Sequence, residues 1–251
     1  MFPRLAEIPT PWGPLVVQTH GVLLAVALVA GWYLFTLGAS ASSPRARGRL
    51  YLTMSLGGLV GGKLVRAASS GGVFFEGGLD ALGVLLGGAF VLWLGGRERA
   101  RELAPRAASV GAVLAAAAGL GEHLGGARFG LVAEEPSWLV VRHPRWPDLL
   151  GSPAWRAHLA DGRIDEDALT SLPTIPVGLL EAAVALVLFA LARWRPRHAP
   201  TIVLGGYALA RFGLDRLREF PSAVDLVAAV LVLVVAIAAS RPMRVASPAS
   251  A

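Results

Sequence analysis

The residues best suited to chemistry lie in the stretch Thr201–Pro221, which begins as an apolar segment and carries four polar side chains on one face. Tyr207, Arg211, Asp215 and Arg218 are spaced by four, four and three residues, which places them on one face of a helix. A charged side chain at membrane depth costs at least about 2.5–3.5 kcal/mol, so such residues usually face a bundle interior or a polar cavity. The stretch is therefore interpreted either as one wall of an anion-binding cavity or as a helix in which Arg211 snorkels and pairs with Asp215.

Other ionisable residues stand near the ends of neighbouring apolar segments. They comprise His20, Lys63, Arg66, Glu122, His123 and Arg128. Glu181 is a carboxylate early in an apolar segment, where it needs a partner that these cations can supply. Several cations near one leaflet suit an anionic phospholipid headgroup. The set therefore predicts an electropositive pocket that faces the outer leaflet.

Each of these residues also has a structural explanation. His20 is interpreted either as an interfacial or core histidine or as a catalytic group, and Lys63 as a snorkelling side chain. Arg128 follows two glycines and can anchor a loop to lipid phosphate. The convergence of the set, and not any one member, favours a binding site.

The composition indicates an integral membrane protein. The 251 residues are 55% hydrophobic and 16% charged, with a mean hydropathy of +0.59, which is too apolar for an ordinary soluble domain. The net charge of +6 comes from short basic clusters between apolar segments, a pattern that fits the positive-inside rule and not nucleic-acid binding. The sequence contains no cysteine, which excludes disulfides, thiolate metal sites and a cysteine nucleophile.

Seven apolar segments predict an all-α bundle of about seven transmembrane helices. They are Val16–Gly38, Leu50–Ala67, Leu82–Gly96, Ala107–Gly125, Pro176–Trp194, Pro200–Leu217 and Ala223–Ser240. Arginine clusters follow the first, third, fifth and seventh segments, which places the N-terminus outside and the C-terminus in the cytoplasm. We expect one transmembrane domain over residues 1–240, with an outer loop at 126–175 and a disordered cytoplasmic tail at 241–251.

Six stretches along the chain form a distinctive series of motifs. They are GPLVVQTHG (13–21), LGGLVGGKLVRA (56–67), LGGARFG (124–130), PSWLVV (136–141), IPVGLLE (175–181) and GYALARFGLDRLR (206–218). In this order they resemble the motifs of the prolipoprotein diacylglyceryl transferases of the bacterial inner membrane. The resemblance places Arg128 on the family's essential arginine, Lys63 on the arginine of the second-helix motif and His20 on a tyrosine. The later motifs match at Glu181, Tyr207, Arg211, Asp215 and Arg218.

The sequence departs from the family pattern at several positions. Leu82 replaces the histidine of a His-Gly-Gly motif, Leu131 replaces the asparagine after the arginine motif, and the following Asn-Gly-Glu is missing. In the fifth-helix motif, Gly178 stands in place of a glutamine and Ile175 in place of a histidine.

The resemblance implies transfer of the diacylglyceryl group of phosphatidylglycerol to the thiol of a lipobox cysteine in a secreted prolipoprotein, with release of glycerol phosphate. The expected partners are phosphatidylglycerol, an anionic phospholipid, and the prolipoprotein signal peptide. No metal, cofactor or nucleic acid is expected. The implied location is the bacterial inner membrane, with the active site towards the periplasm or outer leaflet.

This reaction assigns a role to each candidate residue. The leaving phosphate has to be stabilised, which we assign to Arg128 and Arg211, with Lys63 and Arg218 in support. The thiol must lose a proton, and an imidazole has a suitable pKa range, so the base is His20 or His123. Tyr207 is expected to orient the headgroup, and Glu181 or Asp215 to hold the arginines in place.

Two further functions are compatible with parts of the sequence. A divergent relative can keep the fold and the lipid site without the reaction, acting as a lipid-binding or accessory membrane protein; the lost histidine motif favours this alternative. A transporter would carry polar residues at the membrane midplane and often two similar halves. Neither feature is evident beyond Arg211.

Overall fold

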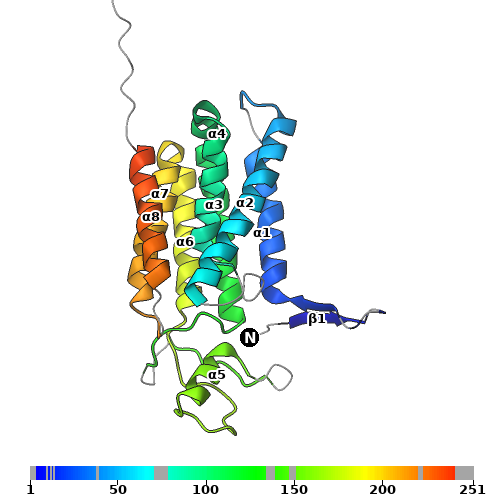
Figure 1. The fold of residues 1–251 in the computed structure, drawn as a ribbon, viewed down its shortest axis with the longest axis vertical. Coiled ribbons are helices and arrows are strands. Elements are labelled where there is room, and N and C mark those ends of the chain that lie inside the picture. The colour runs from blue at the N-terminus through cyan, green and yellow to red at the C-terminus, as the bar shows by residue number, and fades with distance from the viewer. Residues whose placement is uncertain are drawn as a thin grey trace, which may run out of the picture.

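The chain forms a bundle of helices with a small hairpin and a looped region at one end (Figure 1). The computed structural model describes residues 4–9, 11, 13, 15–37, 40–70, 79–133, 139–146, 151–219 and 223–240. In chain order its elements are β1 (Arg4–Ile8), β2 (Leu15–Gln18), α1 (Thr19–Thr36), α2 (Pro44–Ser70), α3 (Ala81–Leu94), α4 (Arg97–Leu124), α5 (Pro153–Ala160), α6 (Val177–Trp194), η2 (Pro196–His198), α7 (Ala199–Asp215) and α8 (Ala223–Ser240). The hairpin and α5 lie at the same end of the bundle (Figure 1), which we call the α5 end.

Each of the seven predicted apolar segments overlaps one of the long helices. The helices α2 and α4 begin earlier than predicted, at Pro44 and Arg97, because their first turns carry the arginines that a hydropathy criterion leaves out. Among the described residues, three helices are long and apolar enough to cross a membrane, namely α1, α4 from Glu98 onwards, and α6. These findings support an all-α membrane protein, while the number of crossings and their orientation remain predictions.

The first predicted segment differs from the structure at its start. Residues Leu15–Gln18 form β2, which pairs antiparallel with β1, and the helix starts only at Thr19. The β-branched pair Val16 and Val17 favours an extended backbone. The predicted tail at 241–251 lies outside the described residues.

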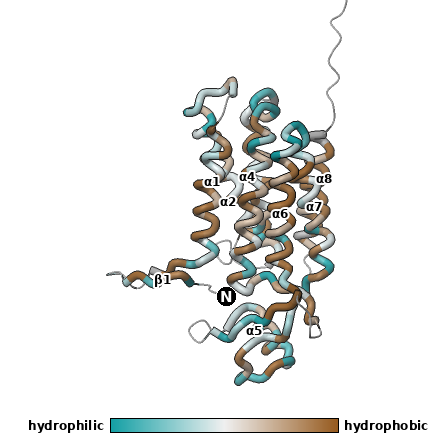
Figure 2. The backbone as a smooth tube through the Cα atoms, turned by 180° about the vertical axis from the view of Figure 1, so that it is seen from behind, coloured by the Kyte–Doolittle hydropathy of each residue, from teal (hydrophilic) through white to brown (hydrophobic). Residues whose placement is uncertain are grey.

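Apolar side chains cover the outside of the bundle. Figure 2 shows hydrophobic residues along the length of α1 and α6 and hydrophilic residues around α5. Large side chains such as Leu186, Val187 and Val234 are more than half exposed, which fits contact with lipid tails. The buried core consists mainly of alanine, leucine and valine from α3, α4, α6, α7 and α8, with Tyr207 at its edge nearest the α5 end.

Glycines bring α2 and α3 into close contact. A Cβ atom at Gly83 would lie 2.3 Å from the carbonyl oxygen of Gly61, and one at Gly87 would lie 2.1 Å from that of Gly57, so only glycine fits at these positions. The same contact fixes the start of α3, because the Asp80 N–H donates to the Gly62 carbonyl at 3.1 Å. Asp80 then caps α3: its Oδ1 accepts from the N–H groups of Leu82 and Gly83 at 2.8 and 3.2 Å.

The outer loop joins the ends of α4, α6 and α7. The Gly130 N–H donates to Ile175, and the Leu131 N–H donates to Leu217, each at 2.8 Å. Farther along the loop, His158 on α5 contacts Glu219 at 3.0 Å. The loop is therefore attached to the segment that follows α7.

The α2–α3 contact yields a stability prediction. Gly83→Ala should lower the free energy of unfolding by about 1–3 kcal/mol, because its methyl group meets backbone atoms that cannot move aside. Gly88→Ala on the same helix is the matched control, since the nearest atom to its Cβ is 3.8 Å away. Thermal unfolding in detergent would measure both variants, and equal stabilities would contradict the packing argument.

Candidate active site

Five buried charged residues meet at the α5 end of the bundle. They are Asp80, Glu122, Arg128, Glu181 and Arg211, each at most 4% exposed. They come from the cap of α3, the last turn of α4, the turn after α4, the first turns of α6 and the second half of α7. We call this group the ion cluster.

Arg128 lies at the centre of the ion cluster. Its Nε is 2.6 Å from Glu122 Oε2, its Nη2 is 3.3 Å from Asp80 Oδ2, and its Nη1 donates to Glu181 Oε2. The turn that places it contains Gly126 with φ +63°, a conformation that glycine adopts without strain. All three guanidinium nitrogens of Arg128 thus contact carboxylates.

Arg211 and Tyr207, both on α7, also contact the carboxylate of Glu181. Arg211 Nη1 donates to Glu181 Oε2 at 2.9 Å, and Nη2 is 3.6 Å from Asp80 Oδ2. The Tyr207 hydroxyl donates to Glu181 Oε1. Tyr207 and Arg211 thus lie on one face of α7, as the helical spacing predicts. Arg211 is only 1% exposed, and its contacts with Glu181 and Asp80 link α7 to α6 and to the cap of α3. The alternative interpretation, in which Arg211 snorkels and pairs with Asp215, stays a prediction.

The remaining predicted residues lie around the ion cluster. Asp215 pairs with Arg218 at 2.8 Å, and both are only partly buried. Lys63 lies partly buried on α2, within electrostatic range of His20. His20, in the first turn of α1, packs against α4 so closely that a Cβ at Gly121 would lie 2.5 Å from its Nδ1.

His123 points towards the outer loop. Its ring makes an edge contact with that of His143, with ring centres 6.4 Å apart. The predicted alternative bases are therefore in different surroundings: His20 packs against Gly121 of α4, and His123 faces the loop.

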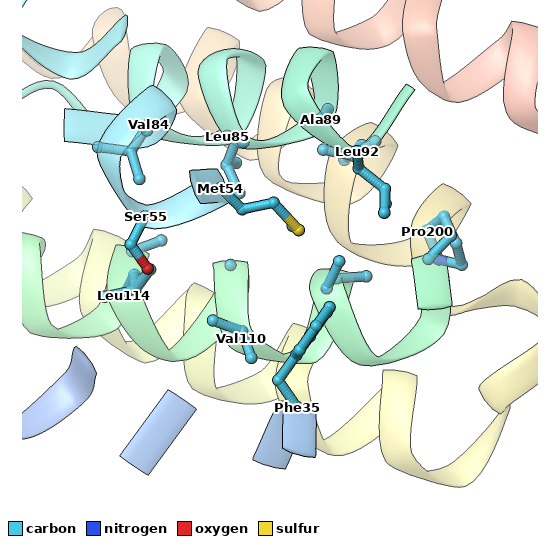
Figure 3. A pocket seen from close by; sticks show the side chains of 18 of the residues that line it. Phe35, Met54, Ser55, Val84, Leu85, Ala89, Leu92, Val110, Leu114 and Pro200 are labelled. Carbon is cyan, nitrogen blue, oxygen red and sulfur yellow. The ribbon is translucent and has the colours of Figure 1, made fainter. Parts of the chain in front are cut away.

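A large apolar cavity lies between the helices, and none of the residues described as lining it belongs to the ion cluster. Its volume is about 810 Å³, within the range of pockets that bind small organic ligands. Figure 3 shows side chains of α2, α3 and α4, among them Met54, Leu85 and Val110, pointing into it. Near the α5 end its lining includes Leu79 and Ala81, on either side of Asp80.

The cavity extends along most of the bundle. Its lining runs along α4 from Ala118, one turn before Glu122, to Arg101, a distance of roughly 25 Å at 1.5 Å per residue. The sequence gives no signal for this cavity, because its lining residues are of the types that fill an ordinary apolar core.

Comparison with known proteins identifies the family. A family model described as prolipoprotein diacylglyceryl transferase matches residues 8–247. The chain belongs to the prolipoprotein diacylglyceryl transferase family. Its general activity class is therefore that of a transferase of lipoprotein biosynthesis, and its apolar helices fit a multi-pass membrane protein. A search of curated proteins gave no match.

Two departures from the transferase motifs have structural reasons. A Cβ at Gly178 would lie 2.8 Å from the Gly119 carbonyl oxygen and 3.2 Å from the His123 Cβ. A glutamine there would separate α6 from α4. Leu82, which stands where the family motif has a histidine, is fully buried in the apolar core, so no imidazole is available at that position.

Two members of the ion cluster, Asp80 and Glu122, have no role in the reaction inferred from the sequence. Asp80 stands directly before an apolar run, which is a helix-cap signal. Glu122 carries no signal beyond its position near the end of an apolar segment. With them, three carboxylates face two guanidiniums in the cluster. Within the ion cluster carboxylates thus outnumber arginines, while Arg66 and Lys63 on α2 act electrostatically on Glu122 and His20 around it. The small cleft beside Arg211 measures about 10 Å³. The electropositive pocket stays a prediction.

The ion cluster yields a prediction about stability. Glu181→Gln should lower the free energy of unfolding by about 3–5 kcal/mol, because it removes the charge that both buried arginines share. Asp215→Asn is the control: its ion pair with Arg218 is partly exposed, and its loss should cost less than about 1 kcal/mol. Chemical unfolding in detergent would compare the variants, and a cost below 1 kcal/mol for Glu181→Gln would contradict the central role of this carboxylate.

The outer loop should become less stable in acid because of His143. This side chain is fully buried, and neither ring nitrogen has a hydrogen-bond partner among the described residues. Burial, with smaller effects of His123 and His158, lowers the pKa of His143 from 6.5 to about 4. The unfolded chain then binds this proton at higher pH than the folded chain, so stability falls as the pH drops from about 6.5 towards 4.

The variant His143→Phe tests this effect. It should unfold with a shallower pH dependence between pH 7 and 4.5, and the difference should be on the order of 1–3 kcal/mol. Thermal unfolding across that pH range is the measurement. Identical pH profiles for wild type and variant would show that His143 does not carry the acid sensitivity.

Proposed function

We propose that this chain transfers the diacylglyceryl group of phosphatidylglycerol to the thiol of a lipobox cysteine in a prolipoprotein signal peptide. The observation that carries the proposal is the meeting of Arg128 and Arg211, buried side by side on Glu181, at the end of an apolar cavity. Family membership supports a transferase of this type. The exact lipid donor and the acceptor peptide are part of the proposal.

The two arginines suit the leaving group of this reaction. When the bond between the glyceryl carbon and the phosphate oxygen breaks, negative charge develops on the phosphate of glycerol phosphate. Two guanidiniums held in a low-dielectric environment stabilise that charge strongly, because they are already oriented and need little reorganisation. Glu181, Asp80 and Tyr207 provide this orientation.

The cavity suits the lipid tails of the same substrate. Its lining is almost entirely apolar, and it begins beside Asp80, which contacts both arginines. A phospholipid with its phosphate at the arginines would extend its acyl chains along α3 and α4. The charged and apolar parts of the structure thus match the two parts of a phospholipid.

His20 is better placed than His123 to accept the thiol proton. It lies within electrostatic range of Arg128 and packs against Gly121, and its Nε2 has no hydrogen-bond partner among the described residues. In the proposed step the thiol proton moves to His20, the sulfur forms a bond to the glyceryl carbon, and the carbon–oxygen bond to phosphate breaks. Glycerol phosphate leaves with the electron pair of that bond.

The location of the site follows from the charge distribution of the sequence. Arginine clusters lie at the end of the bundle opposite α5, as in the loop before α2 and the start of α4. The positive-inside rule then directs the ion cluster towards the periplasm of a bacterial inner membrane. Lys63 and Arg218 would attract the anionic headgroup at that surface.

A second candidate function is lipid binding without transfer. It is favoured by one observation: the family's histidine is replaced by Leu82, which is packed in the apolar core. A chain of this kind would bind phosphatidylglycerol and act as an accessory membrane protein. The experiment below separates it from the enzyme.

Purified protein would be incubated with phosphatidylglycerol labelled in its diacylglyceryl part and with a lipobox peptide. Label should appear on the cysteine peptide and not on its cysteine-to-serine counterpart. Arg128→Lys and Arg211→Lys should each lower kcat/KM by about 10²–10³-fold, since lysine keeps the charge but not the two-pronged contact. His20→Gln should lower kcat by at least about 10²-fold, with His123→Gln as the control that stays near wild type.

Two results would redirect the proposal. Binding of phosphatidylglycerol without any transfer would favour the accessory function. Full activity of both lysine variants would remove the arginines from the mechanism.

A further inference from the structure

Arg128 is only 3% exposed, so a phosphate cannot reach its guanidinium in the arrangement described without displacing a neighbouring group. Its three nitrogens already contact Glu122, Glu181 and Asp80, which occupies three of its five N–H groups. A phosphodiester that binds this buried guanidinium in a bidentate manner is therefore expected to take the place of one of these carboxylates. The question is which carboxylate is held least tightly.

Asp80 and Glu181 are each held through both oxygens. Oδ1 of Asp80 accepts two backbone hydrogen bonds at the start of α3, and Oδ2 faces both arginines. Oε1 of Glu181 accepts from Tyr207, and Oε2 accepts from both arginines. Moving either group would break several charged contacts at once.

Glu122 is held through one oxygen only. Its Oε2 makes the 2.6 Å ion contact with Arg128 Nε. Its Oε1 is buried and has no hydrogen-bond partner among the described residues. A buried carboxylate oxygen without a donor is costly as an anion, and binding a proton lowers that cost because a neutral group is less costly to bury than a charge.

The charge of the ion cluster points to the same residue. Asp80, Glu122 and Glu181 carry one more formal charge than Arg128 and Arg211 can neutralise. An additional phosphodiester anion would increase the imbalance in a region from which water is largely excluded. Protonation of one carboxylate as the phosphate enters would relieve it.

Several other titratable groups surround Glu122. The groups that act on it electrostatically are Arg66 on α2, Asp80, Arg128 and Glu181. Two histidines also lie close: His20 packs against the preceding Gly121, and His123 follows Glu122 in α4. The two histidines are the alternative proton acceptors, and they therefore serve as controls in the test.

We propose that Glu122 is an exchangeable carboxylate: the phosphodiester of an anionic lipid replaces it at Arg128, and Glu122 takes up one proton from solvent as it is released. No covalent bond of the lipid changes in this step. The inference rests on the proposed function, in which an anionic phospholipid is the substrate. It adds that substrate binding is linked to pH through this residue, which fills no position in the family motifs recognised in the sequence.

The test is calorimetric binding of short-chain phosphatidylglycerol to the full chain in detergent. Titrations in two buffers with different ionisation enthalpies give the number of protons taken up for each lipid bound. Wild type should take up close to one proton, and its affinity should fall by up to tenfold per pH unit where Glu122 is ionised. Glu122→Gln should take up none and bind with an affinity independent of pH.

Matched variants identify the residue responsible. Glu102→Gln removes a carboxylate near the opposite end of α4 and should behave as wild type. Glu122→Asp keeps the charge and should retain proton uptake, which guards against a folding defect in Glu122→Gln. His20→Gln and His123→Gln should also retain it.

Each outcome bears on a different claim. Wild-type binding without proton uptake, or uptake that persists in Glu122→Gln, would overturn the inference and leave the proposed function intact. Uptake lost in a histidine variant alone would assign the proton to that histidine and overturn the role of Glu122. No binding of phosphatidylglycerol by wild type would contradict the proposed function and the inference together.

Discussion

Glu181 binds two buried guanidiniums and a tyrosine hydroxyl in the apolar interior of a helical bundle. Each of these charges would be prohibitively expensive alone at that depth, and only their mutual contact makes the arrangement possible. The partners come from α6, from α7 and from the turn after α4, with Asp80 added from the cap of α3. The ends of four helices are thereby held at one point, and the positions of the arginines depend on all of them.

Close packing makes this convergence possible. Glycine pairs let α2 approach α3 and let α4 approach α6 until backbone meets backbone. The first contact sets the position of Asp80, and the second brings Glu181 towards the end of α4. Because the arginines of the cluster already contact carboxylates, the proposed binding of a lipid phosphate involves exchange with one of these carboxylates. The apolar cavity that starts beside Asp80 offers the matching space for acyl chains.

Much of the fold follows from hydropathy alone. Each predicted apolar segment overlaps a helix, because long apolar runs have few alternatives to helix in a membrane. The shared face of Tyr207 and Arg211 also followed from helical spacing, and the motif series indicated the family. The contacts of Arg211 with Glu181 and Asp80 did not follow, because local spacing points only to Asp215, one turn away, as its partner. Such pairings depend on how closely helices approach, and that distance is set by glycines whose roles are visible only in three dimensions. The cavity and the excess of carboxylates over arginines in the ion cluster were not predicted either, because both depend on how closely the helices approach.

The most direct test of the account is a structure of the protein bound to a phosphatidylglycerol analogue that cannot be transferred. The account predicts the phosphate within hydrogen-bonding distance of both Arg128 and Arg211, the acyl chains in the cavity between α2, α3 and α4, and Glu122 displaced from Arg128. A headgroup bound elsewhere, with the ion cluster unchanged and the cavity empty, would contradict it.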